Sequence, residues 1–359
     1  MISKRRVLLG MSGGLDSTMT ALLLKKQGYE VTGVSLRLWD RKGDGHHEEE
    51  ELPYLLEAHK LADQIGIKHL VMDVRDPFSK LVINRFVKEY LDGKTPAPCA
   101  FCNVQIKWNY LLQKADKMDC YYVATGHYVN ILPFRDNYYI FEGVDKVKDQ
   151  SYFLWNLDQK FMARALTPLG GFTKKEIRSL ANELGFNNLA TKKESMSVCF
   201  LQNDSYQSFI RQYPFSQSLP GKGNVTDMKG NIIGRHKGYP FYTIGQKKGL
   251  ELDSELPYNV VQIDKENNQL VVGFKEDLWK NRFVISDFTF VNKQELAEIK
   301  NLSVRIRGLG LNPGGTCKIN ELDAQHLEVI TEEPAWAPAP GQPAVFYNGD
   351  RVLGGGVIT

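Results

Sequence analysis

A short glycine-rich turn near the amino terminus constrains the fold of this chain more than any other feature. The apolar run Val7–Leu9 is typical of a buried strand, the turn Gly10–Ser17 follows it, and a helical pattern starts at Asp16. Backbone N–H groups converge on an anion where such a turn opens a helix, because the helix dipole places partial positive charge there. The paired glycines of the turn remove side chains that would hold phosphate oxygens away, and its two serines add hydroxyl donors. The turn therefore predicts a phosphate site in an α/β fold.

The first half of the chain alternates between strand and helix patterns. Helix patterns at 16–27 and 52–65 are each followed by glycine, an expected helix end. Alternation of this kind predicts a doubly wound parallel sheet with helices on both faces. Ligands of such sheets bind at the carboxyl ends of the strands, so we expect Gly10–Ser17, Leu36 and Gly126 to share one edge. The expected strands are Val7–Leu9, Val31–Leu36, His69–Val74 and Tyr121–Thr125, and the expected helices are Asp16–Gln27, Leu52–Ile65, Pro77–Leu91 and Asn103–Lys117.

The second half changes character. The stretch Ser151–Gly185 has a helical pattern, and Thr173–Glu176 matches a capping box. Beyond Tyr206, short alternating runs rich in glycine and aromatic residues predict β structure. We therefore expect three domains, at 1–204, 205–280 and 281–359. The expected later strands are Asn259–Ile263, Leu270–Phe274, Phe283–Phe290, Leu302–Arg307, Ala344–Tyr347 and Val352–Ile358, with a proline-rich stretch at Glu333–Gly341.

Length and composition fit a globular protein of two or three domains. The 359 residues are 42% hydrophobic and 24% charged, with a net charge of +3. No apolar run reaches membrane-spanning length, and no signal-peptide pattern follows the basic first residues, so we expect a cytoplasmic protein without membrane contact.

Two of the five cysteines stand in a Cys-x-x-Cys pattern, Cys99 and Cys102, just before a predicted helix, and Cys199 lies at the end of the first expected domain. A helix dipole lowers the pKa of a thiol at the helix amino end and favours its thiolate. A structural zinc site would need a fourth ligand, while Cys120 and Cys317 fit buried, inert positions. Two hypotheses stay open: a redox pair of Cys102 and Cys199 that carries and resolves a persulfide, or an iron–sulfur cluster on Cys99, Cys102 and Cys199.

The turn resembles the SGGxDS loop of the PP-loop ATPases, which split ATP between its α- and β-phosphates. Motifs in order along the chain are similar to those of the bacterial tRNA-specific 2-thiouridylase family. They are Gly10–Ser17, Thr95–Asn103, Ala124–Tyr128, Lys148–Leu154, Gly238–Leu250 and Pro340–Tyr347. Three departures are Ala97 for the usual asparagine, Cys99 where some members have aspartate, and Ile306 where tyrosine is more usual.

The resemblance implies an ATP-dependent sulfurtransferase that adenylates the C2 oxygen of the wobble uridine, U34, in a tRNA anticodon stem-loop and replaces it with sulfur. It implies a PP-loop domain, a small central α+β domain and a C-terminal β-barrel, the last two contacting tRNA. It also implies Cys102 as the nucleophile and Cys199 as the persulfide carrier, with an upstream sulfur donor or relay protein as partner. The implied cofactors are ATP and Mg²⁺ near Asp16, with a [4Fe-4S] cluster on the three cysteines as the variant. The implied ATP-binding residues are Gly10, Met11, Ser12, Gly13, Gly14, Leu15, Asp16, Ser17, Leu36 and Gly126, and the implied tRNA-binding residues are Ala97, Pro98, Cys99, His127, Lys148, Asp149, Gln150, Arg305, Ile306, Arg307 and Gln342.

Basic pairs occur in every expected domain and favour an extended RNA footprint, although each pair alone is typical of a solvated surface. They are Lys174-Lys175, Lys192-Lys193, Arg235 with Lys237, Lys247-Lys248 and Arg305 with Arg307. Two rival functions are an amide synthetase of the same fold and an RNA-binding protein with a degenerate ATP site. The first leaves Cys102 and Cys199 without a role, and the second conflicts with the intact serines and aspartate of the turn.

Overall fold

The computed structural model describes residues 3–40, 52–192, 198–201, 204–213, 219–252, 254, 256–308 and 310–359. Its contacts divide the chain into two compact units. The first unit comprises Met1–Val82, Cys99–Met196 and Asp350–Leu353, and the second comprises Ile83–Pro98, Ser197–Gly349 and Gly354–Thr359. The segment 83–98, which the sequence analysis places in the first domain, therefore clusters with the second unit.

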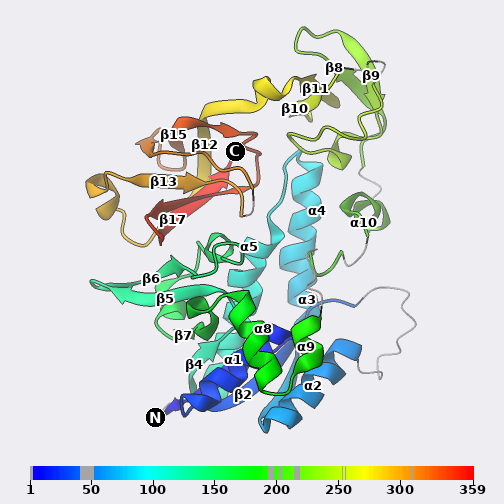
Figure 1. The fold of residues 1–359 in the computed structure, drawn as a ribbon. Coiled ribbons are helices and arrows are strands. Elements are labelled where there is room, and N and C mark those ends of the chain that lie inside the picture. The colour runs from blue at the N-terminus through cyan, green and yellow to red at the C-terminus, as the bar shows by residue number, and fades with distance from the viewer. Residues whose placement is uncertain are drawn as a thin grey trace. The chain divides into compact units, whose positions relative to one another are not determined.

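The first unit is built on a five-stranded, all-parallel sheet in the order β3-β2-β1-β4-β7 (Figure 1). From β1 the chain adds β2 and β3 on one side of the sheet and then β4 and β7 on the other side. The carboxyl ends of β1 and β4 therefore form the topological switch point, where such folds bind ligands. The strands are β1 (Ser3–Gly10), β2 (Glu30–Arg37), β3 (Lys68–Asp73), β4 (Cys120–Ala124) and β7 (Ala165–Leu166).

Helices cover both faces of this sheet. Val7 and Leu9 point toward α1, α2 and α8, where they join a core of fully buried side chains. Gly10 faces the other side, because a β-carbon there would lie 3.1 Å from a methyl group of Leu111 in α6. Burial of each leucine-sized side chain in such a core contributes about 1.5–3 kcal/mol. The helices of this unit are α1 (Leu15–Lys26), α2 (Pro53–Ile65), α3 (Arg75–Phe78), α5 (Pro98–Cys102), α6 (Asn109–Lys117), α7 (Gln159–Met162), α8 (Lys174–Glu183) and α9 (Asn187–Thr191).

Two predicted helices contain a π-helical stretch. The stretch η1 (Ser79–Ile83) separates α3 from α4 (Asn84–Leu91), and η2 (Asn103–Trp108) separates α5 from α6. The second of these follows Cys102 directly, and π-helical turns concentrate at functional sites.

The expectation of continuous helix over Ser151–Gly185 is wrong for its first part. That part contains the 3₁₀ turns η3 (Ser151–Phe153) and η4 (Pro168–Gly171), the short helix α7 and strand β7; only α8 is a long helix. The capping box that opens α8 is confirmed, since Thr173 accepts from the Glu176 amide and Glu176 accepts from the Thr173 amide. A hairpin of β5 (Val129–Phe134) and β6 (Asn137–Glu142) was not expected, and Arg351 at the start of β17 pairs with Phe141 on it.

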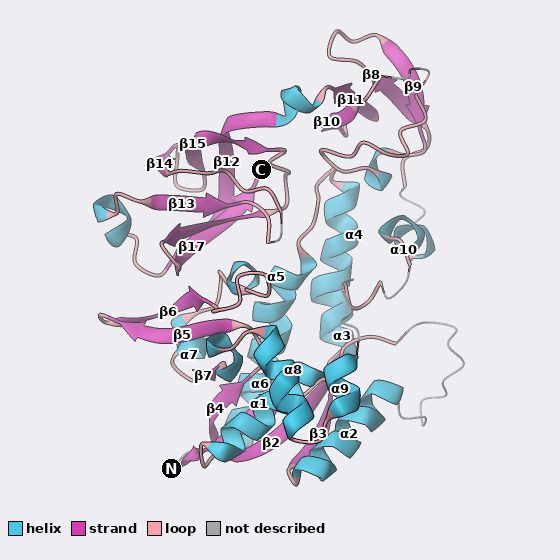
Figure 2. Cartoon of the chain, viewed as in Figure 1, coloured by secondary structure: helices cyan, strands magenta, loops and turns pink. Residues whose placement is uncertain are grey.

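The second unit is rich in strands (Figure 2). One sheet has the order β10-β11-β8-β9, and the other contains β13-β16-β17-β12-β15-β14. The strands are β8 (Gly223–Thr226), β9 (Ile232–His236), β10 (Asn259–Asp264), β11 (Gln269–Gly273), β12 (Trp279–Phe290), β13 (Leu302–Arg305), β14 (Cys317–Glu321), β15 (Leu327–Trp336), β16 (Pro343–Asn348) and β17 (Arg351–Ile358), and α4 and α10 (Tyr206–Gln212) are the helices of this unit. Among the described residues, no helix has both the length and the apolar character needed to cross a bilayer.

Candidate nucleotide and thiolation site

The glycine-rich turn lies at the carboxyl end of β1 and opens α1, as the sequence predicts. No side chain caps α1 at Gly14, so the first turn of the helix presents backbone donors at its amino end. Gly13 has a φ of +72°, and a β-carbon there would lie 3.0 Å from the Ala58 nitrogen. Ser17 Oγ accepts from the Ser12 amide at 3.2 Å and donates to the Gly14 carbonyl at 3.1 Å, which folds the turn onto the helix. This arrangement is suited to holding phosphate oxygens.

The other expected nucleotide residues surround the same helix end. The Met11 amide donates to the Val34 carbonyl at 2.8 Å, which fixes the turn against β2. Leu36 is half-buried near the carboxyl end of β2. A β-carbon at Gly126 would lie 3.0 Å from the Asp16 carbonyl carbon and 3.1 Å from the Ser17 nitrogen. The loop after β4 therefore reaches the first turn of α1 only because residue 126 is glycine.

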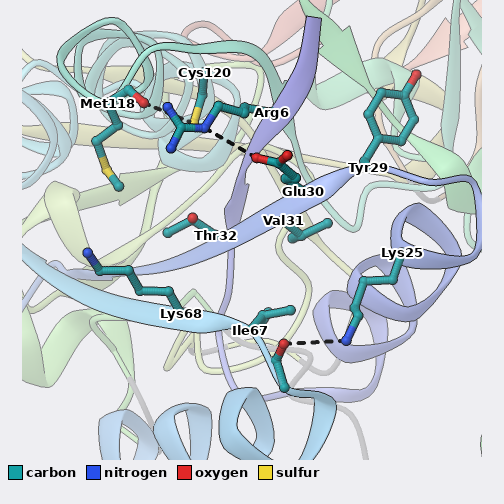
Figure 3. A pocket seen from close by; sticks show the side chains of 11 residues that line it. Arg6, Lys25, Tyr29, Glu30, Val31, Thr32, Ile67, Lys68, Met118 and Cys120 are labelled. Atoms are coloured by element: carbon teal, nitrogen blue, oxygen red, sulfur yellow. Dashed lines mark hydrogen bonds and ion pairs between the residues drawn. The ribbon is translucent and has the colours of Figure 1, made fainter. Parts of the chain in front are cut away.

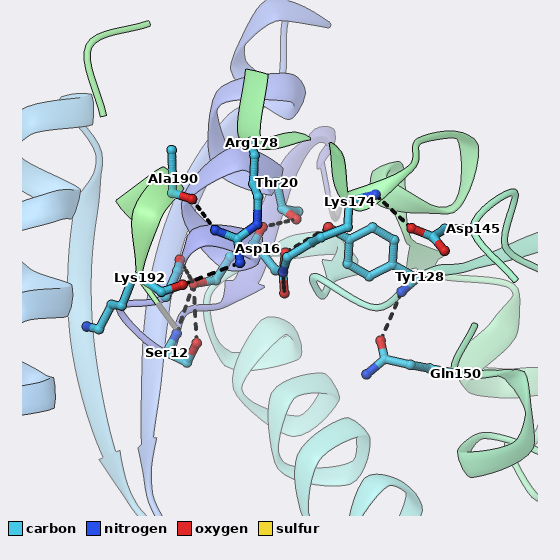
Figure 4. A network of polar contacts seen from close by, with 12 residues as sticks. Ser12, Asp16, Thr20, Tyr128, Asp145, Gln150, Lys174, Arg178, Ala190 and Lys192 are labelled. Carbon is cyan, nitrogen blue, oxygen red and sulfur yellow. Dashed lines mark hydrogen bonds and ion pairs between the residues drawn. The ribbon is translucent and has the colours of Figure 1, made fainter. Parts of the chain in front are cut away.

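A charged network surrounds Asp16 (Figure 4). Lys174 Nζ lies 2.7 Å from Asp16 Oδ1 and 2.9 Å from Oδ2, and the Tyr128 hydroxyl donates to Oδ1 at 2.8 Å. The Lys174 amide donates to Asp145 Oδ2 at 2.9 Å. The predicted RNA contact of the Lys174-Lys175 pair is wrong for Lys174, because its buried side chain forms an ion pair with Asp16. Both Lys174 and Tyr128 were missed as site residues, since they are distant from Asp16 in sequence.

Asp16 fits the role of a magnesium ligand. Its side chain keeps about a third of its surface exposed (36%) beside the uncapped helix end. Mg²⁺ is usually bound by one or two carboxylates together with substrate phosphates, and a single carboxylate next to a phosphate site meets that requirement.

His127 is held as a neutral ring. Its Nδ1 lies 2.7 Å from Thr125 Oγ1, and the ring stacks on Trp108 with centroids 6.5 Å apart. Desolvation, with a smaller contribution from the Lys107 charge, lowers the pKa of His127 to about 3. A contact of His127 with tRNA would therefore be made by a neutral imidazole.

The segment Lys148–Gln150 is bound into the first unit. The buried Asp149 carboxylate accepts from the Gly143 amide at 3.0 Å and from Ser151 Oγ at 2.6 Å. Burial raises the pKa of Asp149. Gln150 Oε1 accepts from the Tyr128 amide at 3.0 Å. The Asp149 side chain thus organises the loop from within, so an RNA contact in this segment falls to its neighbours or to its backbone.

The cysteines of the first unit differ in exposure. Cys102 is buried and Cys99 is exposed in the short helix α5. For Cys99, partial desolvation of the sulfur raises the pKa of the thiol, opposite to the direction that a helix dipole alone would give. Cys120 and Cys317 are buried, and burial raises both pKa values, that of Cys317 to about 12, as expected for inert thiols.

Cys199 belongs to the second unit and is exposed in a turn in which the Leu201 amide donates to the Val198 carbonyl at 3.0 Å. Its neighbour Phe200 is buried against Phe86, with ring centroids 5.0 Å apart. A buried ring thus anchors the turn beside an exposed cysteine. Residues 193–197, which include Lys193 of a predicted basic pair, lie outside the described residues.

An iron–sulfur cluster is not supported by the described residues. No group of three or more histidine, cysteine or acidic side chains gathers among them in a way that would hold a metal ion. Cys99 and Cys102 lie in the first unit and Cys199 in the second. We derive no step through a cluster.

The expected tRNA residues of the second unit have distinct environments. Gln342 Nε2 donates to the carbonyls of Thr95 and Pro96 at 2.8 and 3.0 Å, so it holds the backbone just before Ala97 and Pro98. Arg305 lies over the Tyr347 ring at 4.4 Å, and Arg307 over the Trp336 ring at 4.9 Å. The Ile306 side chain is buried, so a tRNA contact at this position would be made by its backbone.

A cavity of about 260 Å³ opens elsewhere in the first unit, at the amino ends of β1 to β4 (Figure 3). Arg6, Glu30, Lys68 and Cys120 help to line it, and Arg6 pairs with Glu30 at 3.4 Å. Because the phosphate turn lies at the carboxyl ends of the strands, this cavity is not the nucleotide site.

Three domain models match successive parts of the chain. Residues 5–203 match the tRNA methyl transferase HUP domain, residues 207–274 the tRNA methyl transferase PRC-barrel domain, and residues 280–358 the aminomethyltransferase beta-barrel domain. The predicted fold class is confirmed: a PP-loop domain with a parallel sheet, followed by two smaller domains of which the last is a β-barrel.

Curated relatives match the chain from end to end. A protein of Cytophaga hutchinsonii is 41% identical over 100% of this chain and 98% of its own length, and one of Phocaeicola vulgatus is 42% identical over 99% and 94%. A Salinibacter ruber protein is 40% identical over 100% of this chain and 95% of its own length. All three are named tRNA-specific 2-thiouridylase MnmA, the second with the number 3. At 40–42% identity over essentially full length, the chain belongs to the tRNA-specific 2-thiouridylase family.

Proposed function

We propose that this chain is an ATP-dependent tRNA-uridine 2-sulfurtransferase, which replaces the C2 oxygen of a uridine in tRNA with sulfur. The observation that carries the proposal is the uncapped amino end of α1 at the switch point of a parallel sheet, with Asp16 beside it. That geometry supports the binding of ATP phosphates, and the names of the full-length relatives support tRNA as the substrate.

The role of ATP is to convert the uridine C2 oxygen into a good leaving group. Oxide is a very poor leaving group from a pyrimidine ring, whereas AMP is a good one. The uridine C2 oxygen attacks the α-phosphorus of ATP and pyrophosphate departs, leaving an adenylated base. The α1 backbone donors, with Ser12 and Ser17, bind the phosphates, and the backbone at Leu36 and Gly126 borders the adenosine. Asp16 would hold Mg²⁺, which would supply neutralisation of the charge that develops on the pyrophosphate.

Sulfur is delivered by the two cysteines. The terminal sulfur of a persulfide on Cys199 attacks C2 of the adenylated base, AMP leaves, and the tRNA is joined to Cys199 through a disulfide. The Cys102 thiolate then attacks the Cys199 sulfur, which frees the 2-thiouridine and leaves a Cys102–Cys199 disulfide for a cellular thiol to reduce. Exposure of Cys199 suits it to receive sulfur from an upstream donor or relay protein. This route needs two thiols and no metal cluster.

The substrate base must be unpaired, because the C2 edge of a paired uridine is covered inside the helix. We propose the wobble uridine U34 of an anticodon stem-loop as the target, with Ala97, Pro98 and Cys99 nearest the base. The neutral ring of His127, Lys148 and Gln150 of the first unit, and Arg305, Arg307 and Gln342 of the second, contribute the RNA contacts. Such an enzyme works in the cytoplasm, where tRNA is matured and thiols stay reduced.

The test is the product of ATP cleavage. Purified chain is mixed with labelled ATP, Mg²⁺ and an unmodified tRNA transcript, and the nucleotide products are separated. The proposal predicts AMP and pyrophosphate, formed only when a uridine-34 transcript is present. Formation of ADP and phosphate, or equal AMP formation with ammonia and no RNA, would contradict it and favour an amide synthetase.

A further inference from the structure

Lys174 occupies an unusual position for a lysine. It is the first residue of α8, its side chain is only 10% exposed, and its ammonium lies within 2.9 Å of both Asp16 oxygens. The ammonium also lies 5.4 Å from the centroid of the Tyr128 ring, whose hydroxyl donates to the same carboxylate. The side chains of Lys174, Asp16 and Tyr128 are thus in mutual contact beside the amino end of α1.

Helix stability does not account for this lysine. A cation in the first turn of a helix opposes the helix dipole, and burying an ammonium costs several kcal/mol before any partner compensates it. The helix is already capped by Thr173 and Glu176, and Ile177 and Ala181 dock it on the core with no exposed surface. The ion pair with Asp16 compensates this cost. The position of Lys174 is therefore explained by the role of the Asp16 carboxylate and not by the stability of α8.

Mg²⁺ and the Lys174 ammonium compete for the single negative charge of Asp16. Two cations on one carboxylate repel each other, so a metal ion bound to Asp16 weakens the attraction between Asp16 and the ammonium. The released ammonium stays beside the uncapped end of α1, where phosphate oxygens are expected. An ammonium is a strong partner for phosphate.

We propose that Lys174 is a phosphate-binding residue that exchanges partners: it holds the Asp16 carboxylate before nucleotide binds and contacts the β- or γ-phosphate of ATP once the metal occupies Asp16. This inference rests on the proposed function, since it needs ATP at the turn. It adds a residue that distinguishes ATP from AMP, because AMP lacks the phosphates that Lys174 contacts.

The exchange makes a prediction for ATP without metal. In the wild-type chain in EDTA, Asp16 retains Lys174, so ATP binds weakly. In Asp16→Asn the ammonium is released to the phosphates, and metal-free ATP binds more tightly than to the wild type. Adding Lys174→Met to Asp16→Asn weakens ATP binding by roughly 10-fold to 100-fold, the range expected for one charge-assisted contact, and leaves AMP binding unchanged.

The experiment is calorimetric titration of ATP and AMP in EDTA into three variants: Asp16→Asn, Asp16→Asn/Lys174→Met and Asp16→Asn/Lys26→Met. Lys26 is exposed in the last turn of α1, roughly 15 Å from Asp16 along the helix, so the third variant loses the same charge away from the site. Asp16→Asn and Asp16→Asn/Lys26→Met leave the Lys174 ammonium without the Asp16 carboxylate, whereas Asp16→Asn/Lys174→Met removes both charges. Circular dichroism and the melting temperature therefore verify the folding of all three variants before titration.

Equal ATP affinity of Asp16→Asn/Lys174→Met and Asp16→Asn would overturn the inference, as would an equal loss in the Lys26→Met variant. A parallel loss of AMP binding would also overturn it, because that pattern indicates a structural role for Lys174. Failure of the proposed function has a different signature: the wild-type chain with Mg²⁺, ATP and tRNA would release no pyrophosphate.

Discussion

Gly126 and Asp16 are packed so closely that a single added carbon atom would separate them. A β-carbon at Gly126 would meet the Asp16 carbonyl carbon at 3.0 Å and its β-carbon at 3.1 Å. The loop after β4 and the first turn of α1 thus pack directly against each other at the proposed nucleotide site. Gly126 and Asp16, which are 110 positions apart, define this contact.

Substitution Gly126→Ala is expected to push the loop after β4 away from the first turn of α1. The new methyl group must displace backbone as well as side-chain atoms, so we expect a loss of about 1–3 kcal/mol in stability and at least a tenfold loss of ATP affinity. The measurements are thermal unfolding and ATP titration. Gly171→Ala is the matched control, because nothing lies within 4 Å of a β-carbon there; equal behaviour of the two variants would show that the close approach is unimportant.

His127 is expected to make the fold sensitive to acid. Because the pKa of His127 in the folded chain is lowered to about 3 while the unfolded value is near 6.5, the unfolded state gains a proton first as the pH falls. Stability is therefore unaffected by this group above pH 6.5 and declines below it, down toward pH 3. His127→Gln should flatten that decline. NMR of the imidazole ring gives a direct check: a His127 midpoint near 6.5 would refute the lowered pKa and the neutral ring.

Cys99→Ser separates the two sulfur routes. If two thiols suffice, this variant still forms 2-thiouridine, because the Cys99 thiol takes no part in the proposed exchange; a weaker contact with the base would raise KM and leave the reaction itself intact. The measurement is 2-thiouridine content of a tRNA transcript by mass spectrometry, with Cys102→Ser as the inactive comparison. Loss of activity in Cys99→Ser, together with iron in anaerobically purified protein, would instead favour the cluster.

The affinity for tRNA is expected to fall steeply with salt. Each phosphate neutralised by Lys or Arg releases counterions, so a plot of log affinity against log salt concentration should have a slope of several units. Arg305→Met should reduce that slope by about one. Fluorescence anisotropy with labelled tRNA at several salt concentrations measures both, and a flat response would count against an extended footprint.

The sequence predicts the parallel sheet well for a physical reason. Its central strands are buried on both faces and read as continuous apolar runs, as at Val7–Leu9, which lies within β1. The turn that follows carries glycines and serines whose geometry is local, so the start of α1 and the phosphate site can both be predicted without the fold.

Other features depend on contacts that the sequence does not reveal. Pro133 obscures β5, which pairs only with β6 in the described sheet and so tolerates a proline. Pro334 likewise hides the end of β15, where the pairing with β12 shifts register between Lys280 and Arg282.

The Asp16–Lys174 pair joins residues 158 positions apart. From the local sequence, Lys174 is only the residue that follows the capping Thr173, and nothing there distinguishes it from an exposed surface lysine. The burial of Asp149 likewise depends on the loop that closes around it, which the local sequence does not reveal.

The central claim is that ATP cleavage and a persulfide on Cys199 act on the same uridine. The most direct measurement is a single turnover with persulfide-loaded chain, ATP and a tRNA transcript, in which pyrophosphate and 2-thiouridine are counted together. The account predicts one 2-thiouridine for each pyrophosphate in the wild-type chain, and pyrophosphate without 2-thiouridine in Cys199→Ser. Formation of 2-thiouridine by Cys199→Ser, or by the wild-type chain without pyrophosphate release, would contradict it.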